Sequence, residues 1–148
     1  MEKKVRKAVR TFLIQDNKII ATKYKTKINF EYYDIPGGKI EDSETSEQAS
    51  IREFKEETGI EIISQEYKGN VIIEYPNKIF DFDVYLVNIF NGTPLEFEDN
   101  YSFWISIDEL LTKDKKIPSI EILKYLNNEE IKAKIYVDDN HKILKVVK

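Results

Sequence analysis

Cysteine is absent from this 148-residue chain, and the absence excludes several kinds of chemistry at once. Without a thiol the protein has no disulfide, no thiolate nucleophile and no cysteine-ligated zinc site. Basic charge is not in surplus either, since 23 lysines and arginines stand against 27 aspartates and glutamates and the net charge is −4. Because no global positive field attracts nucleic acid polymers, we expect no such polymer as a partner.

Long hydrophobic runs and histidine are also scarce. The apolar run at residues 12–14 ends at Gln15, which is too short for a signal peptide or a membrane span. We therefore expect a cytoplasmic protein with no membrane partner. The only histidine, His141, follows the polar turn 138–140 and is expected to be an exposed loop residue.

Length and composition favour a single globular domain over residues 1–148. The apolar share of 41% and the charged share of 34% are ordinary for such a domain, and 148 residues can bury a substantial core. Internal repeats, low-complexity segments and linkers are lacking, so a second domain is not expected.

Alternating apolar residues and turn signals predict a chain rich in strands. A first hairpin is expected to turn at Asp16-Asn17, and a second at Pro76-Asn77. A third hairpin over 132–148 could extend a sheet, cover an edge or pair between subunits, so a monomer and a homodimer both stay open. The predicted strands are 5–14, 18–25, 29–35, 61–75, 78–90, 103–107, 133–137 and 142–147; a helical turn is predicted at 108–111, and a helix capped by Ser119 ends near Leu126.

A helix is predicted after Thr45, because Thr45 and Gln48 form a capping-box pair and Gly59 is a left-handed stop signal. Its residues Glu53, Glu56 and Glu57 fall within a sector of about 100°.

Like charges at this spacing repel, more so where the helix is partly covered. Bound Mg²⁺, which prefers oxygen ligands, would offset the repulsion. A solvated acidic face is the alternative interpretation.

A glycine pair precedes the acidic loop 41–44. Pro36 is expected to stop ladder pairing there, while Gly37 and Gly38 allow positive φ and close approach of the backbone to a ligand. No Gly-Lys-Ser/Thr follows a long glycine loop, so the segment is not a P-loop.

The spacing of these residues resembles the Nudix box of the Nudix hydrolase family, and the MutT-type branch in particular. The pattern runs from Gly38 through Glu44 to the segment 52–60, and a looser likeness covers about residues 5–126. The resemblance implies an α/β Nudix fold, an α/β/α sandwich around a mixed β-sheet. The C-terminal hairpin would then be an addition to that core.

The resemblance also implies roles for particular residues. It makes Glu53, Arg52, Glu44 and Glu98 the catalytic candidates, with either Glu53 or Glu98 as the general base. Arg52 is expected to pair with Glu56 and so orient the carboxylates. The implied metal ligands for Mg²⁺, with Mn²⁺ as a substitute, are Glu53, Glu56, Glu57, Glu98 and Gly38. The implied substrate-binding residues are Lys23, Gly37, Gly38 and Lys39, although lysines on the Lys23 strand could equally protect an exposed sheet edge.

By resemblance, the expected reaction is Mg²⁺-dependent cleavage of a nucleoside (deoxy)triphosphate to monophosphate and pyrophosphate, a MutT-like activity that would suit removal of oxidised nucleotides. Relatives that select oxidised guanine read the base with an asparagine where this chain has Ser119, and a serine lacks the amide's paired donor and acceptor. A nucleotide sugar or dinucleoside polyphosphate is the alternative substrate, and a non-catalytic nucleotide-binding module is a further alternative. The aromatic residues Phe30, Tyr32 and Phe80 could stack on a base or belong to the core.

Overall fold

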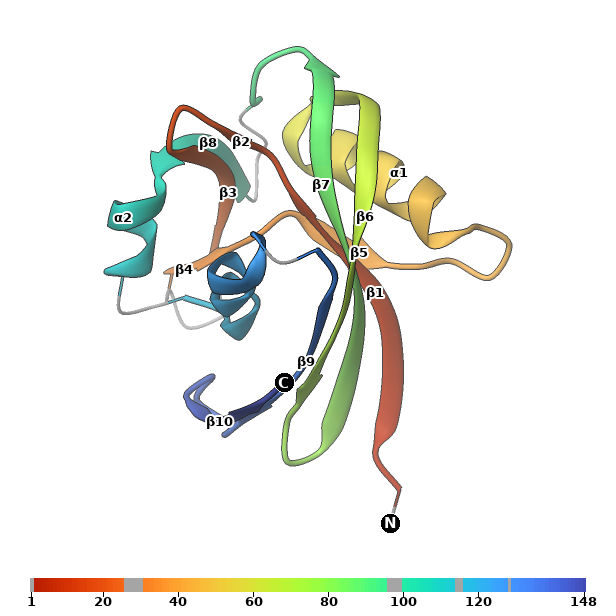
Figure 1. The fold of residues 1–148 in the computed structure, drawn as a ribbon, viewed down its shortest axis with the longest axis vertical. Coiled ribbons are helices and arrows are strands. Elements are labelled where there is room, and N and C mark those ends of the chain that lie inside the picture. Colours follow the sequence, from red (N-terminus) through yellow and green to blue (C-terminus); the bar gives the residue numbers. More distant parts are fainter. Residues whose placement is uncertain (1, 26–30, 96–99, 114–115, 128) are drawn as a thin grey trace.

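Two β-sheets and one long helix make up the fold (Figure 1). The structure is a computed structural model that describes residues 2–148 except 26–30, 96–99, 114–115 and 128. The larger sheet has the strand order β10-β9-β6-β7-β1-β5; the smaller has the order β2-β3-β4, with β8 paired to β3. The strands are β1 (Lys4–Phe12), β2 (Ile14–Gln15), β3 (Lys18–Lys25), β4 (Glu31–Asp34), β5 (Gly37–Lys39), β6 (Glu61–Glu74), β7 (Lys78–Asn91), β8 (Asn100–Ser106), β9 (Ile131–Val137) and β10 (Ile143–Val147).

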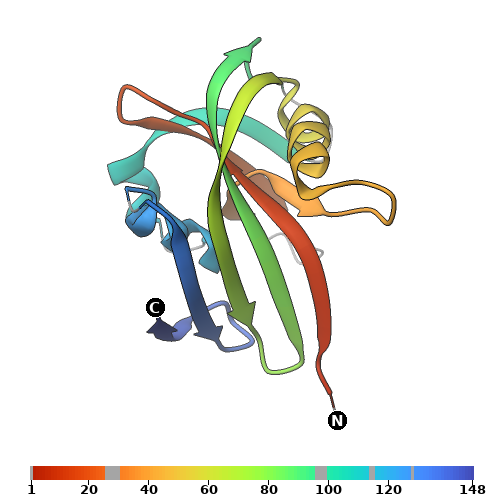
Figure 2. The same ribbon diagram turned by 45° about the vertical axis from the view of Figure 1, so that its right-hand side comes forward.

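The larger sheet is mixed, as predicted. Strand β1 runs parallel to β7 and β9 runs parallel to β6, while the other pairs are antiparallel. Helix α1 (Ser46–Thr58) covers one face, and the short helix η1 (Pro118–Tyr125) lies toward the other (Figure 2). The predicted α/β arrangement of helices around a mixed sheet is confirmed, and the smaller sheet is an addition that the sequence did not predict.

The first predicted hairpin is present, but its leading strand is divided between the two sheets. Asp16 and Asn17 both have positive φ, 53° and 63°, the combination that a two-residue turn of matching twist requires. They join β2 to β3 in the smaller sheet. Leu13, which is 1% exposed, connects β1 of the larger sheet to β2, so the chain changes sheets inside the segment predicted as one strand.

The C-terminal hairpin extends the larger sheet. Strand β9 pairs with β6 from Gly69 opposite Ile131 to Glu74 opposite Tyr136, and β10 forms the sheet edge. Ile135 is fully buried, so the hairpin contributes to the core rather than only covering an edge. Of the three arrangements considered for this segment, sheet extension is the one observed.

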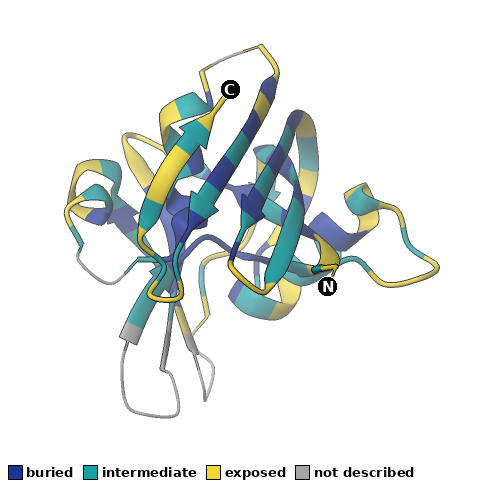
Figure 3. Cartoon of the chain, turned by 90° about the horizontal axis from the view of Figure 1, so that it is seen from below, coloured by how far each residue is buried: buried dark blue, intermediate teal, exposed yellow. Residues whose placement is uncertain are grey.

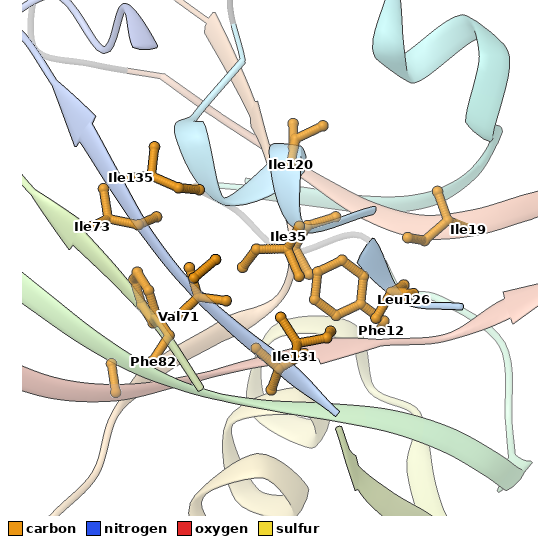
Figure 4. Close-up of a cluster of buried hydrophobic side chains, with 14 of the residues drawn as sticks. Phe12, Ile19, Ile35, Val71, Ile73, Phe82, Ile120, Leu126, Ile131 and Ile135 are labelled. Carbon is orange, nitrogen blue, oxygen red and sulfur yellow. The ribbon is translucent and has the colours of Figure 1, made fainter. Parts of the chain in front are cut away.

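The main core fills the space between the larger sheet, the smaller sheet and η1. The buried residues are dark blue in Figure 3, and Figure 4 shows the side chains that meet in this core. Phe12 from β1 and Ile120 from η1 are fully buried within this cluster. Other members are Ile19, Ile35, Val71, Ile73, Phe82, Leu126, Ile131 and Ile135.

The two helices after β8 are short. α2 (Ile107–Leu111) confirms the predicted helical turn, but η1 is a 3-10 helix and Ser119 does not cap it. Ile117 holds the N-cap position without a side-chain bond, while the buried Ser119 hydroxyl donates to Oδ1 of Asp34 at 2.5 Å. Within the described ranges, the helices include none long and apolar enough to cross a membrane.

Candidate active site

Helix α1 is fixed at both ends by the predicted caps. The hydroxyl of Thr45 accepts from Gln48 N at 3.1 Å, and the Gln48 side chain accepts from Thr45 N at 2.9 Å. At the other end Gly59 has a φ of 79° and donates its N–H to Lys55 O. Phe54, fully buried, anchors the helix to the core. The opposite side of the helix therefore places Glu53 next to Gly38 and Glu57 next to Gly37 of strand β5.

Gly37 and Gly38 lie in a strand rather than a turn, which corrects the expectation drawn from Pro36. They form β5, which pairs with β1, and neither residue has positive φ. Their need for glycine is steric. A Cβ on Gly37 would lie 2.0 Å from Val9 O, and a Cβ on Gly38 would lie 2.5 Å from the carboxyl carbon of Glu53. The glycine pair lets β5 pass directly beneath the helix, so the predicted close backbone approach is present.

Arg52 gathers the acidic side chains around itself. Its Nε and Nη2 atoms bond the two oxygens of Glu44 at 2.9 and 2.5 Å, a bidentate pair. Its Nη1 atom donates to Glu53 at 2.8 Å and to Glu56 at 3.2 Å. Nη2 also donates to Lys39 O at 3.1 Å, which ties the helix to the end of strand β5. The predicted pairing of Arg52 with Glu56 is confirmed. Among these carboxylates, Glu44 is the one that Arg52 contacts through two hydrogen bonds.

Glu57 is the most strongly perturbed carboxyl of the site. Burial raises its pKa to about 8, against the lowering effect of Arg10, while the nearby negative charges of Asp34 and Glu53 raise it further. Its Oε2 atom accepts from Gly37 N at 3.4 Å. Burial also raises the pKa of Glu53, although the hydrogen bond from Arg52 opposes that shift. Burial therefore disfavours the ionised form of both carboxyls, although Arg52 and Arg10 lie nearby.

The donor atoms fit a hard divalent cation. Carboxylate oxygens are the ligands that Mg²⁺ and Mn²⁺ prefer, and a bound cation would offset the cost that burial imposes on the ionised forms of Glu53 and Glu57. Glu56, by contrast, has a side chain 60% exposed and turns to Arg52. Among the side chains that the structure describes, no three histidine, cysteine, aspartate or glutamate residues form a ready-made metal site. The metal-binding roles of these residues stay predictions.

A cavity of about 610 Å³ opens beside this carboxylate cluster. Gly38, Glu44, Arg10 and Phe80 line it, so it runs from the glycine strand to the aromatic face of β7. A second pocket of about 170 Å³ continues past Arg10 and Phe80, toward Asp34, Tyr75, Lys78 and His141. The larger volume is within the range of about 300–1,000 Å³ that is typical of small-molecule sites.

The remaining predicted residues have mixed outcomes. Lys23 is half-buried on β3 with its amine 5.5 Å from the centre of the Tyr33 ring, and its substrate role stays a prediction. Glu98 and Phe30 lie outside the described residues. His141 is not the exposed loop residue we expected: it is half-buried, and its Nδ1 atom lies 2.7 Å from the hydroxyl of Tyr75.

Arg10, Asp34 and Ser119 form a buried polar chain that the sequence did not reveal. Arg10 Nη2 donates to Asp34 Oδ2 at 3.4 Å, and its guanidinium lies 4.4 Å from the centre of the Phe82 ring. A signal was present, since Arg10 shares a strand face with the buried Ala8 and Phe12. A charge on a buried face indicates a partner, but its identity cannot be read from the strand alone.

A family model described as NUDIX domain matches residues 4–126. The chain belongs to this NUDIX family. It is similar to an 8-oxo-dGTP diphosphatase from Escherichia coli, with 31% identity over 113 residues that make up 76% of this chain and 88% of that protein. It is also 43% identical over 72 residues to an 8-oxo-dGTP diphosphatase from Haemophilus influenzae, which is 49% of this chain and 53% of that protein.

Similarity to other NUDIX relatives is more local in sequence and more extensive in structure. The chain spans 53%, 36% and 50% of the lengths of three diphosphatases that it matches, from Haemophilus influenzae, Bacillus subtilis and Proteus vulgaris. Its fold superimposes on the MutT protein from Bacillus halodurans with a TM-score of 0.79 and 19% identity, covering 96% of both chains. The matched fold therefore includes the C-terminal hairpin, whereas the family model ends before it.

Proposed function

We propose that this protein hydrolyses a nucleoside (deoxy)triphosphate to the monophosphate and pyrophosphate with the help of Mg²⁺, for which Mn²⁺ can substitute. The observation that carries the proposal is the position of Glu53 and Glu57 against the glycine strand, whose residue Gly38 also lines a cavity with Phe80 and Phe82 in its wall. Relatives named 8-oxo-dGTP diphosphatase support a triphosphate substrate. Oxidised purine nucleotides are accordingly the first substrates to test.

Each part of the substrate has residues suited to it. Glu53 and Glu57, with Glu56, Glu98 and the backbone of Gly38, would hold the divalent cation. That cation supplies charge neutralisation at the phosphates and lowers the pKa of a bound water. The backbone of Gly37 and Gly38, with the amines of Lys23 and Lys39, is suited to bind the phosphate chain, and the pocket beside Phe80 would hold the base.

Arg52 and Glu44 act through position. Because Arg52 bonds Glu44, Glu53 and the carbonyl of Lys39 together, it fixes the Glu53 carboxylate relative to the loop. Glu53 or Glu98 would accept the proton of the attacking water. Water then forms a new bond to phosphorus, the bridging P–O bond breaks, and pyrophosphate leaves.

The test is pyrophosphate and phosphate release by the full chain across a nucleotide panel, with Mg²⁺, Mn²⁺ or EDTA. The panel contains 8-oxo-dGTP, dGTP, CTP, a nucleotide sugar and a dinucleoside polyphosphate. Metal-dependent release of pyrophosphate from a triphosphate, abolished in Glu53→Gln and Glu57→Gln, supports the proposal. Cleavage of only the sugar or dinucleoside substrate would reassign the substrate, and nucleotide binding without any cleavage would make the protein a binding module.

A further inference from the structure

The turn between β9 and β10 holds His141 in a fixed orientation. Asp138 Oδ1 accepts from Asn140 N at 2.8 Å and from Lys142 N at 3.0 Å, while Asp138 O accepts from His141 N at 3.2 Å. His141 itself has a φ of 65°, a left-handed conformation that few residues other than glycine adopt and that histidine tolerates better than most. The turn thus places the His141 side chain against Tyr75.

The imidazole is held by Tyr32 of β4 and by Tyr75, which directly follows β6. Its Nδ1 atom lies 2.7 Å from the Tyr75 hydroxyl at the end of β6. Its ring meets Tyr75 edge-on at 5.5 Å between centres and Tyr32 of β4 edge-on at 5.3 Å. A ring packed in this way keeps its plane and direction when a ligand arrives.

The held imidazole forms one wall of the 170 Å³ pocket beyond the carboxylate cluster. The stacked rings of Phe80 and Phe82 form another part of the wall, and Lys78 also lines the pocket. Burial, followed by the nearby charge of Lys78, lowers the pKa of His141, so the ring is neutral at pH 7. A neutral imidazole has one donor and one acceptor nitrogen, and Tyr75 engages only Nδ1.

We propose that His141 is a specificity-determining residue, whose Nε2 atom hydrogen-bonds the edge of the substrate's nucleobase in this pocket. The proposal rests on the proposed nucleotide hydrolysis, but it concerns a residue beyond the part of the chain that the family model matches, which ends at 126. The C-terminal hairpin would then extend the sheet and also select the base.

Two variants and a matched control test the role. His141→Phe keeps a flat ring and removes both nitrogens, whereas His141→Asn suits the left-handed backbone and shortens the side chain. Asp139→Ala changes an exposed residue of the same turn and serves as the control. The readout is the ratio of kcat/KM values for purine and pyrimidine triphosphates. Loss of one well-placed hydrogen bond should change this ratio by about tenfold in both His141 variants and by less than about twofold in the control.

The coupling between His141 and Tyr75 gives a second readout. Tyr75→Phe removes the hydroxyl that holds Nδ1, so it should alter base selectivity in the wild-type background and have no further effect in His141→Phe. A merely structural role would lower activity on all bases alike. Unchanged base ratios in both His141 variants would overturn the proposal.

A binding measurement separates this inference from the proposed hydrolysis. Nucleoside monophosphates of different bases are titrated into the full chain in EDTA and followed by calorimetry, where no diphosphate linkage can be cleaved. If the wild type binds one base preferentially and His141→Phe loses the preference, the inference holds even for a protein without hydrolytic activity. Equal affinities for all bases in both proteins would contradict the inference while leaving hydrolysis untouched.

Discussion

A methyl group on Gly38 would lie 2.5 Å from the carboxyl carbon of Glu53, because the Glu53 side chain of helix α1 packs directly against strand β5 there. The neighbouring residue Gly37 is constrained differently. A methyl group on Gly37 would strike the backbone oxygen of Val9 at 2.0 Å, in the strand paired with β5. The two neighbouring glycines are therefore required for different reasons. Gly38 leaves room for the Glu53 carboxylate, and Gly37 allows β5 to pair with β1.

We expect Gly38→Ala to lower kcat/KM by about 100-fold or more while leaving a folded protein, because displacement of a reacting group by about 1 Å is enough for such a loss. Gly37→Ala should instead destabilise the fold by about 1–3 kcal/mol, the usual cost of inserting a methyl group into a packed site. Thermal melts and turnover of both variants check the pair. A Gly38→Ala protein with wild-type turnover would show that the Glu53 carboxylate can shift without loss of activity.

Glu57→Gln should make the metal-free protein more stable at neutral and basic pH. The folded-state pKa of Glu57 is about 8, against 4.5 for the free side chain, so between these values the unfolded chain releases a proton that the folded chain keeps. The stability of the wild type therefore falls as pH rises from 4.5 to about 8 and levels off above. Glutamine does not ionise, so the stability of the variant does not fall over this pH range for this reason.

Melting temperatures of both proteins in EDTA, measured from pH 5 to pH 9, check the Glu57 prediction. The advantage of Glu57→Gln should grow up to about pH 8, and added Mg²⁺ at pH 8 should raise the melting temperature of the wild type more than that of the variant. Parallel pH profiles in the two proteins would mean that Glu57 is not held protonated.

Glu44 has the opposite pH signature. Its pKa is lowered to about 2, first of all by the hydrogen bond from Arg52. A lowered pKa contributes stability that is fully present above about 4.5 and is lost as pH falls toward 2. The difference in stability between the wild type and Glu44→Gln should therefore be largest above pH 4.5 and should shrink in acid. Urea unfolding at pH 3 and at pH 6 measures it, and an equal difference at the two pH values would refute the assignment.

Lys23→Ala should raise the KM for a triphosphate several-fold and change kcat little, because the amine is proposed to bind phosphate in the ground state and the transition state alike. Lys132→Ala, which removes an exposed amine on β9, is the matched control for the change in charge. Steady-state kinetics of both variants decide the matter. If the two KM values stay equal to that of the wild type, Lys23 does not bind the phosphates. The alternative that Lys23 protects an exposed sheet edge is wrong, because β3 pairs with β4 on one side and with β8 on the other.

The features predicted best from the sequence are those that depend on residues close together in the chain. The capping box at Thr45, the stop at Gly59 and the turn at Asp16-Asn17 are each made by atoms a few residues apart, and all three are present. The spacing of the glycines and glutamates from Gly38 to Glu57 was also informative, because these residues lie in one strand, one loop and one helix that follow one another directly in the chain.

Contacts between distant segments were not predictable from periodicity. Strand β8 pairs with β3 across about 80 residues of chain, and the turn that presents His141 lies 66 residues from Tyr75. A lone histidine beside a polar turn looks exposed in sequence, since burial here depends on where the hairpin docks. The glycine pair was misread for the same reason, because the strand that requires it is formed by residues 8–10.

Ser119→Ala should destabilise the protein by about 1.5–3 kcal/mol, the cost typical of losing a hydrogen bond to a charged group. The fully buried Ser119 hydroxyl donates to Asp34 at 2.5 Å, and Asp34 also receives Arg10 and the N–H of Ile35. Ser46→Ala is the control, because that hydroxyl meets the neutral hydroxyl of Tyr85 at 2.6 Å and its loss should cost only about 0.5–1.5 kcal/mol. Urea unfolding of the two variants at pH 7 gives the comparison. A smaller loss of unfolding free energy for Ser119→Ala than for Ser46→Ala would show that the hydrogen bond from Ser119 to Asp34 does not stabilise the fold as expected.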